Sequence, residues 1–169
     1  MKKILFLFGL FFINITIACS ILADEAKNDW IISTSTSEID DSQTVILEVK
    51  SEHQIYTRLY ESITPYLIIR CQNNKTDVYI NWWSYLGLDE TKIITRIDKE
   101  KASSKWWNIS TDNKAAFYPG NVIKFINSLF GKNKLFAQVT PYGESPVKAT
   151  FNITGLSDKI IPLRKSCGW

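Results

Sequence analysis

A single histidine limits the acid–base and nucleophilic chemistry available to this 169-residue chain. His53 lies in the polar stretch Ser51–Gln54, and no serine or cysteine nucleophile stands in an elbow-like motif around it. A Ser-His-Asp or Cys-His site would have to use this histidine, since the nucleophile of such a site needs a neighbouring base. We therefore interpret His53 as a surface-loop residue without a catalytic role.

The chain also has few residues that could bind a metal ion or a cofactor. Structural and catalytic zinc sites use three or four Cys, His or acidic ligands, and this chain has one histidine and three cysteines. The seven glycines are scattered singly, so the chain has no glycine-rich loop that could hold a phosphate group. We expect no metal site and no cofactor.

Paired carboxylates are the remaining catalytic possibility. Glycoside hydrolysis needs two such groups, one acting as acid and the other as base or nucleophile. The candidates are Asp40, Asp41, Asp89, Glu90 and Glu52. Adjacent acids next to serine, threonine or other turn residues are typical of solvated turns. The sequence therefore favours a protein that is not an enzyme, with a carboxylate hydrolase as the less favoured interpretation.

The first 23 residues have the layout of a secretory signal peptide. A basic start is followed by an apolar run over residues 4–13 and then by small residues. This run is shorter than the roughly 20 apolar residues that span a bilayer. Cleavage after Ala23 would leave residues 24–169 as a single exported domain. Two alternatives stay open, namely a retained N-terminal anchor and lipidation of Cys19, which ends a lipoprotein-like Thr-Ile-Ala-Cys sequence.

The net charge of the exported part argues against nucleic-acid binding. Removal of the signal peptide takes away Lys2 and Lys3 and no acid, which leaves 18 basic and 17 acidic side chains. A protein that binds nucleic acid is expected to carry a clear excess of basic residues. We therefore expect no nucleic-acid partner.

Two cysteines, Cys71 and Cys167, remain in the exported domain whichever way the N-terminus is processed. In an oxidising compartment such a pair most simply forms one disulfide bond. This bond would connect the middle of the chain to its last residues. Two buried, reduced thiols are the alternative.

Four of the six tryptophans form two doublets. Successive side chains of a strand point to opposite faces, so strand alternation places one indole of each doublet in the core and the other outside. The interpretation that we favour is burial of both indoles, because an amphipathic helix or the C-terminal tail can cover the second face. An exposed indole would suit a protein contact or a sugar-stacking platform. The candidate binding residues are Trp82, Trp83, Trp106 and Trp107, together with the polar loop 99–105.

Short β-like runs separated by polar turns dominate the chain from Trp30 onward. We predict strands over residues 30–35, 44–50, 66–71, 76–82, 92–98, 105–110, 134–140 and 147–154. The run at 66–71 is the most hydrophobic, so we expect it to be central in the sheet. The turn Gln72–Lys75 should join it to the next strand as a hairpin.

Only the segment from Val122 to Phe130 has a clear helical periodicity, with Pro119 and Gly120 before it and Gly131 after it. The tail over residues 157–167 is a second candidate helix, although Pro162 weakens it. We therefore expect a mainly β domain, an antiparallel β-sandwich or open barrel with one or two short helices packed on it.

The order of several landmarks resembles one known family. The landmarks are LIIRC at 67–71, TDVYINW at 76–82, TRID at 95–98, WNISTD at 107–112, NSLF at 127–130, ATFNITGL at 149–156 and PLRKSCGW at 162–169. Together with Trp30 they resemble the type VI secretion system-associated TagO (VasI) family of bacterial envelope proteins. Cys71 and Cys167 match the cysteine positions of this family.

The resemblance implies an exported accessory protein in the periplasm or envelope of a Gram-negative bacterium. Such a protein would act through contacts with an envelope or secretion-apparatus protein and would not be an enzyme. A different class stays open, a module that recognises glycans such as peptidoglycan, or an inhibitor of an exported hydrolase. A lipid on Cys19 would anchor the protein to the outer membrane.

Overall fold

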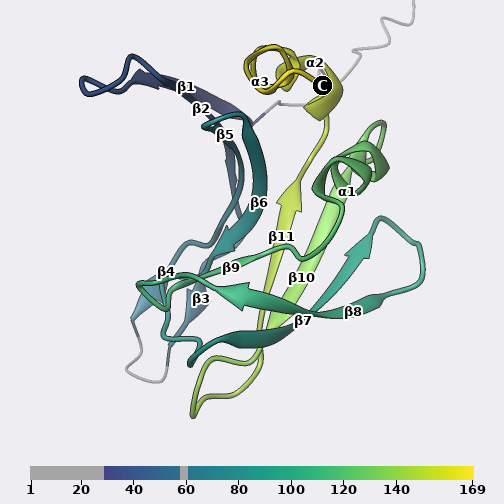
Figure 1. Cartoon of the computed structure of the whole chain (residues 1–169). Coiled ribbons are helices and arrows are strands. Elements are labelled where there is room, and N and C mark those ends of the chain that lie inside the picture. Colours follow the sequence, from purple (N-terminus) through teal and green to yellow (C-terminus); the bar gives the residue numbers. More distant parts are fainter. Residues whose placement is uncertain (1–28, 58–60) are drawn as a thin grey trace, which may run out of the picture.

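The computed structural model describes residues 29–57 and 61–169, which form one large antiparallel sheet with three short helices (Figure 1). Nine strands follow one another across the sheet in the order β1-β2-β5-β6-β9-β8-β7-β10-β11. Their bounds are β1 Ile31–Thr36, β2 Gln43–Lys50, β5 Tyr66–Gln72, β6 Lys75–Asn81, β7 Glu90–Ile97, β8 Ser103–Ile109, β9 Ala115–Phe117, β10 Lys134–Val139 and β11 Val147–Asn152. A separate two-stranded sheet joins β3 (Ile55–Tyr56) to β4 (Ser62–Ile63). The predicted mainly β fold is confirmed.

The sheet bends so strongly that its two halves face each other. Figure 1 shows β1, β2, β5 and β6 on one side and β7, β8, β10 and β11 on the other, with β9 between the halves. At one corner the chain after β2 reaches the far edge, because Ser51 forms a bridge with Phe151 and the Glu52 N–H donates to the Thr150 carbonyl at 2.8 Å. The result is an open, sandwich-like sheet and not a closed barrel.

Alternating side chains build the core between the two halves. In β2, Val45, Leu47 and Val49 point inward and are buried, while the residues between them are partly exposed. Helix α1 (Val122–Leu129) buries Phe125, Ile126 and Leu129 against this core. Burial of apolar side chains on both halves is the main force that closes the sheet over itself.

The C-terminal tail forms two helices, α2 (Leu156–Lys159) and α3 (Ile161–Cys167), where we predicted one. Pro162 does not weaken this region, because it lies in the first turn of α3, where its missing N–H would have no intrahelical partner. Figure 1 shows both helices above the β2–β5–β6 half of the sheet. Leu163 on α3 is fully buried there.

The predicted disulfide is present. Cys71 at the end of β5 and Cys167 at the end of α3 are bonded, with Cα atoms 5.8 Å apart. Next to it, the Trp169 indole N–H donates to the Thr76 hydroxyl at 2.9 Å, and the Arg164 guanidinium lies 5.1 Å from the centre of the Trp169 ring. The disulfide and Trp169 together hold the tail against the sheet.

Some predictions concern residues outside the described part of the chain. The signal segment, residues 1–23, and the candidate lipidation residue Cys19 are among them. Within residues 29–57 and 61–169, no helix has both the length and the apolar character needed to cross a membrane.

Candidate functional site

The two tryptophan doublets each place one indole in the core and one at the surface. Trp82 and Trp107 are 0% and 1% exposed, whereas Trp83 and Trp106 are 50% and 57% exposed. Strand alternation therefore gave the right division, and the favoured interpretation that both indoles of each doublet are buried is wrong. Trp82 and Trp107 have to be removed from the candidate binding residues, because their buried side chains cannot reach a partner.

The physical cause differs between the doublets. Trp106 and Trp107 both lie in β8, so strand alternation separates them. Trp83 follows the end of β6, and its backbone is left-handed with φ +52°. Its N–H donates to the Asn81 Oδ1 atom at 3.0 Å, which stabilises this turn and directs the Trp83 indole outward.

Helix α1 explains why Trp107 is covered. The Trp107 ring makes edge contacts with Tyr118 and Phe125, at centroid distances of 5.3 Å and 6.4 Å. Tyr118 and Phe125 stack on each other at 4.1 Å. Phe125 belongs to α1, so the helix and the segment before it close the inner face of β8.

Two loops bring a second pair of exposed aromatic side chains together. Tyr85, in the loop before β7, accepts a backbone hydrogen bond of 3.0 Å from Tyr142, in the loop after β10. Their rings meet edge to face, with centroids 5.8 Å apart. We call the exposed aromatic residues of these loops, Trp83, Tyr85 and Tyr142, together with the exposed Leu88, the aromatic rim. Figure 1 shows that the start of β7 and the β10–β11 connection lie at the same end of the molecule.

Gly87 allows the backbone turn between Tyr85 and β7. Its φ of +105° is a conformation that residues with a Cβ rarely adopt. A Cβ at this position would lie 3.7 Å from the Tyr142 ring, which is an ordinary contact distance, so the φ angle and not lack of space favours glycine. The glycine therefore stabilises the loop geometry that brings Tyr85 and Tyr142 together.

A shallow groove beside Trp106 lies at the same end of the sheet. Trp106 is opposite Lys92 in the β7–β8 ladder, and Gln138 is opposite Ile94 in the β7–β10 ladder. The Trp106 groove has a volume of about 310 Å³ and is lined by Thr91, Lys92, Ile94, Trp106, Gln138, Val139 and Thr140. It combines one flat apolar ring with an amide, hydroxyls and a cation. Such a set can stack on a sugar ring and bind its hydroxyl groups.

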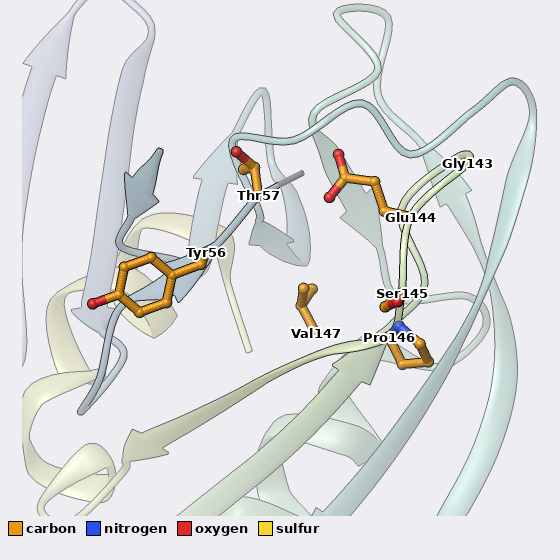
Figure 2. A pocket seen from close by; sticks show the side chains of 7 residues that line it. All are labelled: Tyr56, Thr57, Gly143, Glu144, Ser145, Pro146 and Val147. Carbon is orange, nitrogen blue, oxygen red and sulfur yellow. The ribbon is translucent and has the colours of Figure 1, made fainter. Parts of the chain in front are cut away.

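A second depression, of about 640 Å³, lies between β3 and the β10–β11 connection (Figure 2). Its lining residues are Tyr56, Thr57, Gly143, Glu144, Ser145, Pro146 and Val147. Figure 2 shows Val147 between Tyr56 and Pro146, with Thr57 and Glu144 at one side. Glu144 is the one acidic group among these seven side chains, so the depression does not offer the two carboxylates of a glycosidase.

The candidate catalytic residues are spread over separate turns. Asp40 and Asp41 lie in the β1–β2 turn. Asp89, with φ +60°, lies in the turn before β7, and Glu90 is the first residue of β7. Glu52 forms an ion pair with Lys134 at 3.1 Å. His53 is exposed, and its carbonyl accepts a hydrogen bond of 2.7 Å from the Ser51 hydroxyl. In the described part of the chain, no three metal-binding side chains come together.

The polar loop 99–105 lies away from the aromatic rim. Only its first part is a loop between β7 and β8, because residues 103–105 already belong to β8, and it lies at the end of β7 that is opposite to Lys92. Within it, Glu100 forms an ion pair of 2.6 Å with Lys132, and Lys105 donates to the Tyr118 hydroxyl at 2.7 Å. These contacts give the loop a structural role.

Sequence reasoning missed Tyr85, Leu88 and Tyr142. They come from loops more than 50 residues apart along the chain, so no local pattern relates them. One signal was available, since Leu88 and Tyr142 stand next to Gly87 and Gly143 in turns, where a large apolar side chain has no obvious core position. Pairing of β7 with β10 was the information needed to bring these loops together.

Comparisons with known proteins give first a likeness in fold and then the family. In structure, the chain is similar to the crystal structure of invasion associated protein B from Bartonella henselae, with a TM-score of 0.53 and 12% identity over 81% of this chain and 94% of that one. At that identity the likeness concerns the fold alone. The comparison with curated proteins gives no match. A family model described as type VI secretion system VasI, EvfG matches residues 16–169. The chain therefore belongs to the VasI family, in agreement with the resemblance of its landmarks.

Proposed function

We propose that this protein is an exported accessory of a type VI secretion apparatus that acts by protein–protein contact in the periplasm and has no enzymatic activity. The exposed aromatic rim is the observation that carries the proposal. Large aromatic side chains at a surface are enriched in the energetic centres of protein interfaces. Family membership supplies the secretion context. The Cys71–Cys167 disulfide supports an oxidising compartment.

Export in this proposal depends on residues 1–23, whose removal would free the domain in the periplasm. Lipidation of Cys19 is the alternative route, and it would hold the same domain at the outer membrane. The rim is formed by residues after position 80, so both routes keep it within the exported domain.

Substitution of the rim tests the contact directly. The double variant Trp83→Ala, Tyr142→Ala should lower recovery of crosslinked secretion-apparatus subunits from intact cells at least about 30-fold, the size expected for a hot-spot residue. Mass spectrometry identifies and quantifies the crosslinked subunits. Secretion by the apparatus should fall together with the recovery of crosslinked subunits.

The control for this experiment is Ile161→Ala, which removes an equally exposed apolar side chain on α3. It should leave both readouts unchanged. Wild-type recovery and secretion from a folded double variant would show that the rim is not the contact surface.

A second function, recognition of a glycan such as peptidoglycan, is favoured by the Trp106 groove. Addition of murein fragments should change the intrinsic tryptophan fluorescence of the protein, and Trp106→Ala should remove most of that change. Trp83→Ala serves as the matched control, since it removes an exposed indole outside the groove. No fluorescence change at millimolar fragment would exclude this function.

A further inference from the structure

The two edges of the large sheet differ in how they are protected. The β11 edge is partly covered, because Ser51 and Glu52 bond to Phe151 and Thr150, and β3 lies beside β11. The β1 edge is the other end of the strand order, and no strand of the described chain pairs with its outer side. In Figure 1, β1 lies at the outer margin of the molecule.

The register identifies which backbone groups are free at this edge. The Ser37 N–H donates to the Ser42 carbonyl, and the pairing continues as Ser35 with Thr44 and Ser33 with Ile46. Hydrogen-bonded pairs alternate with non-bonded pairs in an antiparallel ladder. The N–H and C=O groups of Ile32, Thr34 and Thr36 therefore point away from β2, toward the open edge.

Strand β1 carries none of the usual protections of an edge. Natural sheets block free edges with lysine, proline, bulges or very short strands. The sequence Ile-Ile-Ser-Thr-Ser-Thr has no charge and no proline, and it pairs with β2 without interruption over six residues. All six side chains are exposed. Such an edge can accept a further strand.

The charge around the edge selects among possible partners. Residues 29–50 contain the acids Asp29, Glu38, Asp40, Asp41 and Glu48 and one basic residue, Lys50. Hydrogen bonds from Ser37 and Ser42 lower the pKa of Asp40, so this turn stays negative at neutral pH. Antiparallel pairing with a second copy would bring the acidic turn of each copy toward Asp29 of the other. Like charges would oppose that pairing.

We infer that the open edge of β1 binds an extended segment of a partner protein by strand addition, and that this segment carries lysine or arginine at its ends. The backbone of Ile32, Thr34 and Thr36 supplies the hydrogen bonds. The acidic β1–β2 turn supplies the preference for a basic partner. This inference does not depend on the aromatic rim, which lies at the ends of β7 and β10.

The test uses a blocked peptide of sequence Lys-Thr-Val-Thr-Val-Thr-Lys as the probe. When about nine-tenths of the protein is bound, amide hydrogen exchange at Ile32, Thr34 and Thr36 should slow about tenfold. Exchange at Ser33 and Ser35 should change little, since these amides already bond to β2. Added salt should weaken the effect. A peptide with proline at its centre is the control and should give no protection.

The variant Thr34→Pro should abolish the protection, because it removes a free-edge N–H without removing a β1–β2 hydrogen bond. Thr34→Val keeps the N–H and a similar shape, and it should bind like the parent. Protection that persists in Thr34→Pro would overturn the inference, as would its absence with the parent protein at millimolar peptide. Protection that grows with protein concentration alone would instead indicate self-pairing. If Thr34→Pro disturbs the hairpin, the comparison between the probe peptide and the proline peptide on the parent protein still tests the inference. Trp83→Ala should leave the protection by the probe peptide unchanged.

Discussion

Replacement of both Cys71 and Cys167 by alanine should lower the free energy of unfolding by about 4 to 5 kcal/mol. The disulfide joins residues 96 positions apart, so its loss releases a long loop in the unfolded chain. Entropy of the unfolded chain grows with the length of that loop. Since domains are stable by only about 5 to 15 kcal/mol, the expected loss is a large part of the total. Urea denaturation followed by fluorescence measures it.

The fold should survive this double substitution under native conditions. Leu163 on α3 stays buried against the sheet, and Trp169 keeps its hydrogen bond to Thr76. The parent protein in reducing agent is the control, and its stability should match that of the alanine variant. If the free energies of unfolding of the oxidised parent and the alanine variant differ by less than about 1 kcal/mol, the entropic explanation of the stabilisation by the disulfide is wrong.

Local sequence patterns were sufficient for the long strands and for α1. The run TVILEVK alternates as expected, and β2 buries every second residue within it. The turn between β5 and β6 was equally readable, because Asn73 and Asn74 tolerate the positive φ that a tight hairpin needs. In α1, the Asn121 side chain accepts from the Lys124 N–H at 2.8 Å and begins the helix.

The parts that sequence reasoning missed depend on contacts between distant segments. Strand β9 has three residues and becomes a strand only because β6 and β8 lie on either side of it. Strand alternation predicted an outward indole in the first doublet, yet Trp83 lies outside a strand and turns outward through its left-handed backbone. The rim required the β7–β10 pairing. The sequence therefore predicted that exposed indoles form part of the site, but it did not predict which residues of distant loops lie near them.

Trp106→Ala and Trp107→Ala should differ sharply although the two residues are adjacent. Removal of the buried Trp107 ring would leave a cavity beside Tyr118 and Phe125 and should cost about 3 to 5 kcal/mol. Removal of Trp106, which is 57% exposed, should change stability by only about 0.5 kcal/mol. Urea denaturation of both variants measures the difference.

The same pair separates a folding role from a binding role on one strand. Trp107→Ala should lower the folded fraction of the protein and weaken every binding function with it. A lower temperature or a small ligand that stabilises the folded state should restore that fraction. Trp106→Ala should change only processes that use the groove, at unchanged stability. Equal destabilisation by the two substitutions would mean that another surface covers Trp106 in solution, and the groove would then be an interface already occupied. Because the two indoles lie on opposite faces of β8, a single strand tests both the core and the exposed face of this half of the sheet.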